Sequence, residues 1–230
     1  MKYDVIIVGA GPGGIFSSYE LMKNDPALKV AVFEAGNSLE KRKCPIDGKK
    51  VKSCINCATC AIMSGFGGAG AFSDGKYNIT NDFGGTLFEH IGKEEAIDLM
   101  NYVDHINMTH GGEGTKMYST AGTDLKKVCM QNKLKLLDAS VRHLGTDINY
   151  IVLENLYAEL KDKIDFFFRT PVETIEVIDG GYRVHTADAS YECEKCVISV
   201  GRSGSKWMEN VCKKLEIPTS SNRVDIGVRV

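Results

Sequence analysis

The hydrophobic pattern of the first 34 residues predicts a βαβ unit. Residues 5–8 are four consecutive β-branched apolar residues, as in a short buried strand. The glycine-rich residues 9–14 follow, and residues 15–23 carry apolar side chains at helical spacing. A second apolar run, residues 29–33, ends at Glu34. A strand, a turn, a helix and a strand within about 30 residues form a βαβ unit, which belongs to a parallel sheet.

The middle of the chain opens with a long stretch, residues 44–85, that has no periodicity and is rich in glycine and cysteine. A stretch of this length inside a domain is usually functional. Beyond it the pattern predicts helices at residues 92–108, 124–133 and 147–161, a polar loop at 109–123 and a strand at 134–141. We expect Asp147 to cap the helix that begins there.

The last third of the chain predicts mostly strands. These are expected at residues 164–168, 172–178, 182–186, 196–200 and 224–230, with a helix at 206–215. The sequence Asp179-Gly180-Gly181 between two of them is a strong hairpin signal. The sequence ends within the strand predicted at 224–230, and a strand without a partner would leave an apolar edge unpaired. We therefore expect residues 224–230 to begin a further, truncated domain. Residues 1–223 are expected to form one dinucleotide-binding domain.

The composition is that of an ordinary folded protein, and it argues against a membrane-spanning protein and a nucleic-acid-binding protein. Of 230 residues, 43% are hydrophobic and 25% are charged, and no apolar run approaches the ~18 residues that span a membrane. Lysine and arginine total 28 against 30 acidic residues, so the chain has no basic field for nucleic acid. The first residues match the pattern of neither a signal peptide nor a transit peptide, so we expect no targeting segment. We therefore expect a cytoplasmic protein that acts on a small molecule.

The first glycine cluster matches a dinucleotide-binding fingerprint. Gly9, Gly11 and Gly14 follow a predicted strand and open a predicted helix, with Pro12 in the same turn. Gly9 allows the tight turn, Gly11 lets the backbone approach a pyrophosphate, and Gly14 allows close packing of helix on strand. Glu34, about twenty residues further on, suits hydrogen bonds to a ribose. This fingerprint by itself does not distinguish NAD from FAD.

A second glycine cluster favours FAD. The segment 65–76 contains too many glycines for a stable helix, but its backbone amides suit the edge of a planar ring. The candidate FAD contacts in it are Gly67, Gly68, Ala69, Ser73, Asp74 and Gly75. Lys76 is a candidate catalytic residue that would favour negative charge on a reduced flavin. The alternative is a mobile glycine-rich lid.

These motifs together resemble a known family. The strings are VIIVGAGPGG, FEAG, KRKCP, CINCATC, IMSGFGGAGAFSDGK, HLGTD, VGRSG and VDIGVRV. They resemble the FAD-dependent, NAD(FAD)-utilising dehydrogenases of the glutathione-reductase-like flavoprotein superfamily. The resemblance implies an α/β fold with a Rossmann-type parallel sheet and flanking helices. It further implies an inserted antiparallel β-meander, which is expected within residues 164–200. It also implies a substrate domain in a protein roughly twice this length.

The resemblance carries residue roles with it. Gly9, Gly11 and Gly14 would hold the FAD diphosphate, and Glu34 would hold the adenosine ribose. Val172 would meet the adenine through its backbone, and Gly201 would form a second glycine turn near the diphosphate. Arg42, in the KRKCP string, is a further candidate FAD contact. His143 lies between a predicted strand and a helix, a usual place for ligand contacts, and is a candidate proton donor.

Four cysteines suggest a metal site. Cys54, Cys57 and Cys60 form CxxCxxC, and Cys44 precedes a proline. This spacing is typical of a [4Fe–4S] cluster, although zinc, redox-active thiols or unliganded thiols also fit it. Of the other cysteines, Cys193 and Cys196 border a buried strand, and Cys129 and Cys212 lie on amphipathic helices, so we expect all four to pack in the core.

The sequence therefore predicts an FAD-dependent oxidoreductase. It would transfer hydride or electrons through the flavin between a nicotinamide, NAD(P)H, or another donor and an unidentified substrate. Two alternatives remain open. One is a thiazole-synthase-like enzyme that uses the dinucleotide as substrate with a cysteine as sulfur donor. The other is a non-catalytic module that senses redox state or nucleotide.

Overall fold

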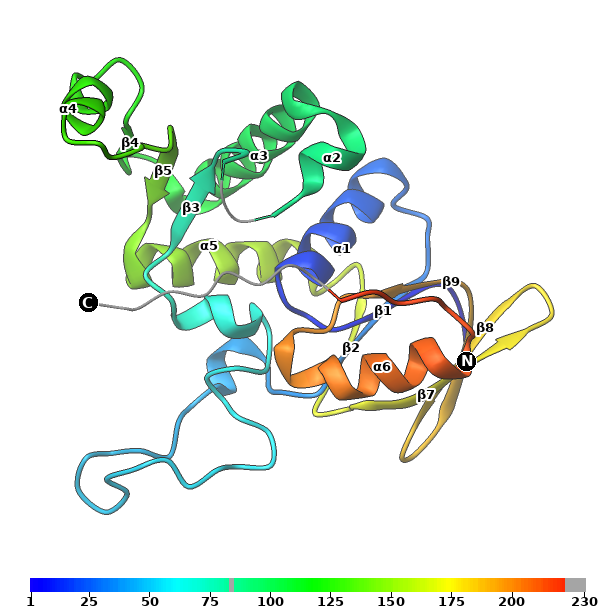
Figure 1. Ribbon diagram of the computed structural model, residues 1–230. Coiled ribbons are helices and arrows are strands. Elements are labelled where there is room, and N and C mark those ends of the chain that lie inside the picture. Colours follow the sequence, from blue (N-terminus) through cyan, green and yellow to red (C-terminus); the bar gives the residue numbers. More distant parts are fainter. Residues whose placement is uncertain (83–84, 222–230) are drawn as a thin grey trace.

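The computed structural model describes residues 1–82 and 85–221 and is built on a six-stranded sheet (Figure 1). The strand order is β6-β2-β1-β9-β8-β7, and the first four strands are parallel. The strands are β1 Lys2–Val8, β2 Val30–Glu34, β6 Asp165–Phe168, β7 Val172–Ile178, β8 Gly181–Thr186 and β9 Ser190–Ile198. The predicted α/β class with its parallel sheet is confirmed. The meander β7-β8-β9 is antiparallel and joins the parallel sheet through β9.

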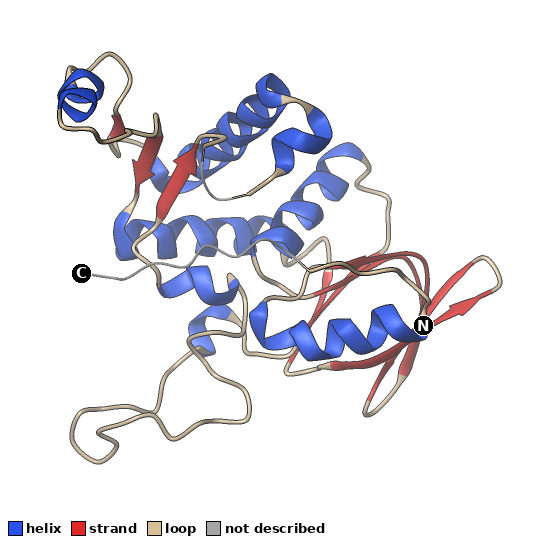
Figure 2. Ribbon diagram, viewed as in Figure 1, coloured by secondary structure: helices blue, strands red, loops and turns tan. Residues whose placement is uncertain are grey.

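Alternation along β1 divides the core into two layers. Val5 and Ile7 face a cluster that includes residues of α1, Pro12–Asn24, and of α5, Gly145–Leu160. Ile6 and Val8 face the opposite cluster, which Val184 of the meander and Trp207 of α6, Ser205–Lys214, complete. Because successive side chains of a strand point to opposite faces, a continuous apolar run such as 5–8 requires cover on both. Figure 2 shows α1 and α5 on one side of the sheet and α6 on the other.

A second, three-stranded sheet lies beyond α5. It contains β3 Lys76–Ile79, β5 Ser140–His143 and β4 Met117–Ser119, in that order and antiparallel. Nearby helices are α2 Leu87–Ile91, α3 Lys93–Asn107 and α4 Leu125–Gln131. Arg142 of β5 forms a two-bonded ion pair with Asp104 of α3, at 2.7 and 3.0 Å, which attaches the sheet to that helix. The hydrogen bond that Arg142 donates to the Asp104 carboxylate raises the pKa of Arg142.

Several sequence predictions differ from the structure. The predicted strand at 134–141 is observed at Ser140–His143, and neither β3 nor β4 was predicted. The helix expected at 147–161 begins at Gly145 with Leu144 as its N-cap, so Asp147 lies in the first turn and is not the cap. These short strands carry little periodicity of their own and form because β5 pairs with both neighbours. The strand predicted at 224–230 lies outside the described residues.

The stretch 43–67 contains neither helix nor strand and extends from the body of the molecule as a long loop (Figure 2). It holds the CxxCxxC motif. Its end returns to the sheet as η2, a short 3₁₀ helix at Gly68–Phe72. No helix within residues 1–82 and 85–221 is long and apolar enough to cross a membrane.

Candidate functional site

A cavity of about 980 Å³ opens at the carboxyl ends of β1, β2 and β9. In parallel sheets this edge is the usual place for ligands. The lining comes from the turn after β1, the end of β2, the loop 57–70, the start of β7 and the segment 199–207. Of the predicted cofactor contacts, Gly9, Gly11, Pro12, Glu34, Gly68, Ala69, Val172 and Gly201 line it. The structure therefore brings residues from both glycine clusters to one cavity.

The first glycine turn has the geometry that the fingerprint requires. Gly9 has φ +103°, and a Cβ atom there would lie 2.5 Å from the carbonyl oxygen of Ser199 in the turn after β9. A Cβ atom at Gly14 would overlap the carbonyl oxygen of Gly9. A side chain at Gly9 would push the first glycine turn away from the turn after β9, and one at Gly14 would push α1 away from the sheet. Both glycines therefore serve the close packing that the sequence predicts for this turn.

The amino end of α1 faces the cavity. Gly11 is its N-cap and Pro12 its first residue, no side chain caps it, and Gly11, Pro12 and Gly13 line the cavity. The first N–H groups of a helix have no acceptor within the helix, and the helix dipole is positive at this end. Such an end suits a phosphate. A Cβ atom at Gly11 would have only the Cα atom of Gly68 within 4 Å, at 3.9 Å.

The second glycine segment packs directly on the first. The N–H of Gly67 donates to the carbonyl oxygen of Ala10 at 2.8 Å. A Cβ atom at Gly68 would lie 3.1 Å from the Cα atom of Gly11. Gly68, Ala69 and Gly70 then continue the cavity wall. The two clusters, far apart in sequence, form one continuous backbone surface.

Glu34 joins the two clusters. Its side chain is buried at 7% exposure at the end of β2. One carboxylate oxygen accepts from Ala10 N–H at 2.8 Å, and the other accepts from Gly36 at 2.8 Å and Gly65 at 2.9 Å. Glu34 also lines the cavity. The residue predicted to hold a ribose thus braces both glycine segments as well.

Arg42 holds the second segment from within the protein. The guanidinium, on a residue with 6% exposure, donates to four backbone carbonyl oxygens at 2.6 to 2.9 Å. These carbonyls belong to Ala61, Ile62, Phe66 and Gly68. It also lies 4.8 Å from the ring centre of Phe72, and burial lowers its pKa. Arg42, predicted as a cofactor contact, lies outside the cavity lining and supports the segment that forms it.

The two predicted catalytic residues lie together outside this cavity lining. Lys76 of β3 is opposite His143 of β5, and the Lys76 ammonium lies 2.8 Å from the Asp74 carboxylate. The hydrogen bond from Lys76, and to a lesser extent the charge of His143, lower the pKa of Asp74. The backbone of Gly75 accepts from Leu144 N–H at 2.9 Å. Asp74 and Lys76 therefore lie shortly after η2 in the chain, and His143 lies opposite Lys76 at the carboxyl end of β5, the central strand of the second sheet.

The remaining predicted contacts are Gly14, Gly67 and Ser73. They do not line the cavity, and they contact the backbone of the two glycine segments that do. The hydroxyl of Ser73 donates to the carbonyl oxygen of Gly70 at 2.8 Å. The sequence analysis missed Ser199, Pro171 and Trp207, all of which line the cavity. Pro171 and Ser199 follow the ends of β6 and β9, which is a signal that could have found them, because neighbouring parallel strands end at one edge. Trp207 lies within α6 and carries no such signal.

The predicted metal ligands are not brought together. Cys54 and Cys57 are exposed, and Cys44 and Cys60 are half-buried. Among the described residues, no three His, Cys, Asp or Glu side chains form a group that could hold a metal ion. Cys57 and Cys60 instead line the cavity. The arrangement does not fit a four-cysteine cluster.

The cysteines expected in the core are mostly there. Cys193 is buried and Cys196 packs against the same apolar cluster, opposite Tyr3 and Ile6 of β1. Hydrogen bonding between the two thiols lowers the pKa of Cys193 and raises that of Cys196. Cys212 is buried, whereas Cys129 is only half-buried.

Comparison with known proteins supports the fold. No protein-family model matches the chain, and a search of curated proteins finds no match. Among solved structures, the chain is similar to glycine oxidase from Geobacillus kaustophilus, at 16% identity and a TM-score of 0.53, over 94% of this chain and 59% of that one. It is also similar to NikD, an amino acid oxidase essential for nikkomycin biosynthesis, at 13% identity and a TM-score of 0.51, over 93% of this chain and 54% of that one. The chain thus spans a little over half the length of these two proteins.

Proposed function

We propose that the chain binds FAD in the cavity at the carboxyl ends of β1, β2 and β9 and that it belongs to a flavin-dependent oxidoreductase. The observation that carries this proposal is the convergence of the two glycine clusters, braced by Glu34, on one cavity. The first glycine turn alone would suit NAD as well as FAD. The backbone of Gly68 to Gly70 adds a second wall to the cavity, so the site is larger than the fingerprint turn alone would provide. The shared fold with two oxidases agrees with redox chemistry.

The residues of the chain fit the parts of FAD. The backbone of Gly11 and Gly13 at the amino end of α1 would hold the diphosphate. Glu34 has a buried carboxylate at the cavity wall and would accept from the adenosine ribose. Val172 lines the cavity at the start of β7, where its backbone would meet the adenine. Gly201 also lines the cavity and would approach the diphosphate.

The pair Lys76 and His143 would act near the reacting ring. When bound, FAD would supply two-electron transfer between NAD(P)H or another donor and a substrate. Lys76 places a positive charge directly after η2, where it would stabilise negative charge. His143 lies opposite Lys76 on β5 and is the candidate proton donor of the pair. The proposal includes no iron–sulfur cluster, because among the described residues the four cysteines do not form a group that could hold one.

An anaerobic spectrum tests this proposal. The chain, loaded with FAD, should be yellow with bands at roughly 370 and 450 nm, and NADH or NADPH should bleach the longer band. Calorimetry should show binding of FAD. A chain that binds NAD in calorimetry but not FAD would contradict the proposal.

One observation favours a second candidate. Cys57 and Cys60 line the cavity, so either could donate sulfur to a bound dinucleotide, as in a thiazole-synthase-like enzyme. In that case β-elimination would break the Cβ–S bond of one cysteine, with its Cα proton passing to solvent, and would leave dehydroalanine. The released sulfide would form a new bond to a ribose carbon of NAD, with nicotinamide as the leaving group. Intact-mass spectrometry after incubation with a dinucleotide distinguishes the two candidates, since only sulfur donation lowers the mass of the chain.

A further inference from the structure

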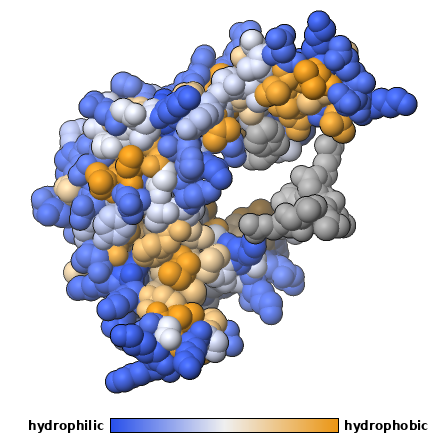
Figure 3. All heavy atoms as spheres, turned by 90° about the vertical axis from the view of Figure 1, so that its left-hand side faces the viewer, coloured by the Kyte–Doolittle hydropathy of each residue, from blue (hydrophilic) through white to orange (hydrophobic). Residues whose placement is uncertain are grey.

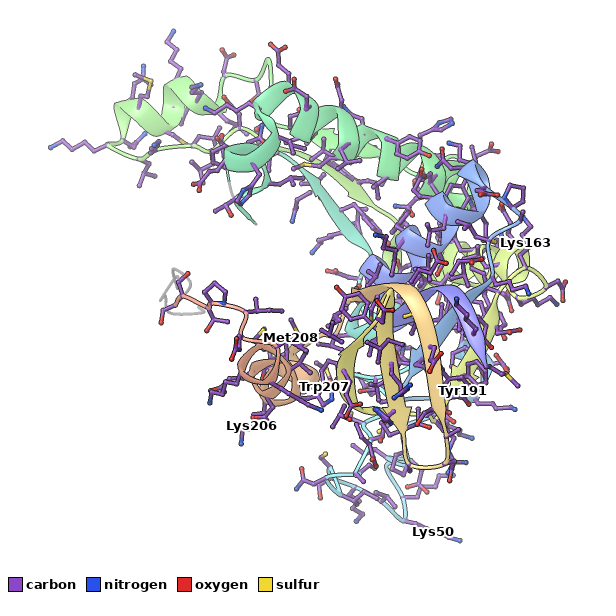
Figure 4. All side chains as sticks on the ribbon, turned by 90° about the vertical axis from the view of Figure 1, so that its right-hand side faces the viewer. Lys50, Lys163, Tyr191, Lys206, Trp207 and Met208 are labelled. Atoms are coloured by element: carbon purple, nitrogen blue, oxygen red, sulfur yellow. The ribbon has the colours of Figure 1, made fainter. Side chains whose placement is uncertain are left out.

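Trp207, the only tryptophan in the sequence, lines the same cavity from α6. It is half-buried and packs against the apolar cluster on the α6 side of the sheet. Figure 4 shows its side chain between α6 and the strands, whereas Lys206 points away from them. Neither Lys206 nor Met208 lines the cavity. The indole is thus the part of α6 that a ligand in this cavity would meet.

The orientation of the indole is set by its N–H group. This group donates to the backbone carbonyl oxygen of Glu173 at 2.9 Å, at the start of β7. The only polar group of the indole is therefore hydrogen-bonded to the protein, and this bond fixes the ring beside the start of β7. The bond also places Trp207 next to Val172, the residue that follows Pro171 in the cavity wall.

The surroundings of Trp207 match a flat aromatic base better than a phosphate. Pro171, Val172 and Ala35 contribute apolar atoms to this wall of the cavity. Glu34 places a carboxylate beside Ala35, at the end of β2. A negative side chain repels phosphate but accepts hydrogen bonds from ribose hydroxyls. A nucleoside with its ribose toward Glu34 would bring its base toward Trp207.

We infer that Trp207 is the platform on which the adenine ring of the bound dinucleotide stacks. This inference rests on the proposed function, since it assigns the adenine end of the same site. Stacking on an aromatic side chain is a strong and chemically tolerant contact for a base. An adenine can belong to FAD, to NAD or to free ADP, so the tests must distinguish these sources.

The fluorescence of Trp207 provides a direct test, because the sequence contains no other tryptophan. Titration of the wild-type chain with ADP, which contains adenine but no flavin, should quench the emission. Inorganic pyrophosphate, which contains the diphosphate but no adenine and does not absorb the emission, should leave it unchanged. FAD and NAD should then be titrated by calorimetry alongside fluorescence. Binding of ADP or FAD in calorimetry without any change in tryptophan emission would overturn the inference and leave the proposed function standing.

Variants at position 207 supply the second measurement. Trp207→Ala should weaken binding of FAD and ADP about tenfold, whereas Trp207→Phe retains a ring and should recover most of the affinity. Lys206→Ala, on the same helix and outside the cavity lining, should bind FAD as the wild type does. Equal affinity of the alanine and wild-type chains for ADP would overturn the inference.

The two proposals fail in different ways. A chain that binds ADP with quenching but does not bind FAD supports the adenine platform and contradicts the flavin function. A chain that binds neither contradicts both. Thermal unfolding of each variant shows whether a lost affinity reflects a lost fold, and the wild-type quenching experiment does not depend on any variant.

Discussion

The carboxylate of Glu34 accepts a hydrogen bond from the backbone N–H of Gly65 at 2.9 Å, across a sequence separation of 31 residues. The same carboxylate accepts from Ala10. One side chain thus fixes the distance between the fingerprint turn and the second glycine segment. Both walls of the cavity depend on this contact, and so does any ligand held between them.

Glu34→Gln should destabilise the protein and weaken FAD binding together. The amide retains one acceptor oxygen, but its NH₂ group faces a backbone N–H and cannot accept. Leaving one buried donor unpaired costs about 1–3 kcal/mol. Urea unfolding should show this loss. Glu209→Gln, at an exposed ion pair of α6, is the control and should change stability little. Unchanged stability of Glu34→Gln would contradict the bracing role.

Arg42→Met should loosen the second glycine segment. The substitution leaves four backbone carbonyl oxygens without their donor, and we expect a loss of about 3 kcal/mol or more in the free energy of unfolding. Limited proteolysis should then cut the stretch 43–67 faster. Arg183→Met, which removes an exposed ion pair with Glu192, should leave the cleavage rate unchanged.

Gly11→Ala should separate ligand binding from folding. Gly11 is extended, and its new Cβ atom would make only an ordinary contact at 3.9 Å with Gly68, so the thermal unfolding temperature should stay near that of the wild type. The methyl group occupies the place where a diphosphate would approach the backbone. FAD affinity should fall about tenfold or more. Wild-type affinity in this variant would place the diphosphate elsewhere.

Cysteine alkylation should report ligand binding. Cys57 and Cys60 line the cavity, whereas Cys54, in the same loop, is exposed and does not. Saturation with FAD should slow alkylation of Cys57 and Cys60 and leave the rate at Cys54 unchanged. Peptide mass spectrometry measures the three rates separately. Equal rates with and without FAD at Cys57 and Cys60 would show that the ligand does not reach this wall.

Acid should weaken the contact between α5 and the turn after α3. His110 and Glu159 lie 2.9 Å apart, and this hydrogen bond lowers the pKa of Glu159 below its ordinary 4.5. A carboxyl with a lowered folded-state pKa contributes stability above its unfolded pKa and loses that contribution as the pH falls through the folded value. Wild-type stability should therefore decrease below about pH 4.5 more than that of Glu159→Gln. Glu154→Gln, at an exposed position of α5, should follow the wild type.

Sequence alone was sufficient for the elements that follow from clear short-range periodicity or from turn residues. The βαβ unit at residues 2–34 follows from short-range periodicity, and the hairpin of β7 and β8 follows from Asp179-Gly180-Gly181. The fingerprint also predicted a tight turn at Gly9 and close packing of helix on strand at Gly14. These features are local, because they are specified within a few turns of chain.

Only the tertiary structure decided which distant residues meet. Nothing in the sequence near Arg42 indicates that its guanidinium binds four carbonyls of the loop end, or that Trp207 reaches the start of β7. The antiparallel pairing of β3, β4 and β5 and the separation of the four cysteines were equally hidden. The physical reason is that such contacts depend on how the helices pack on the sheets. The periodicity of apolar residues indicates only which side of a helix or strand is buried, and not which element covers it.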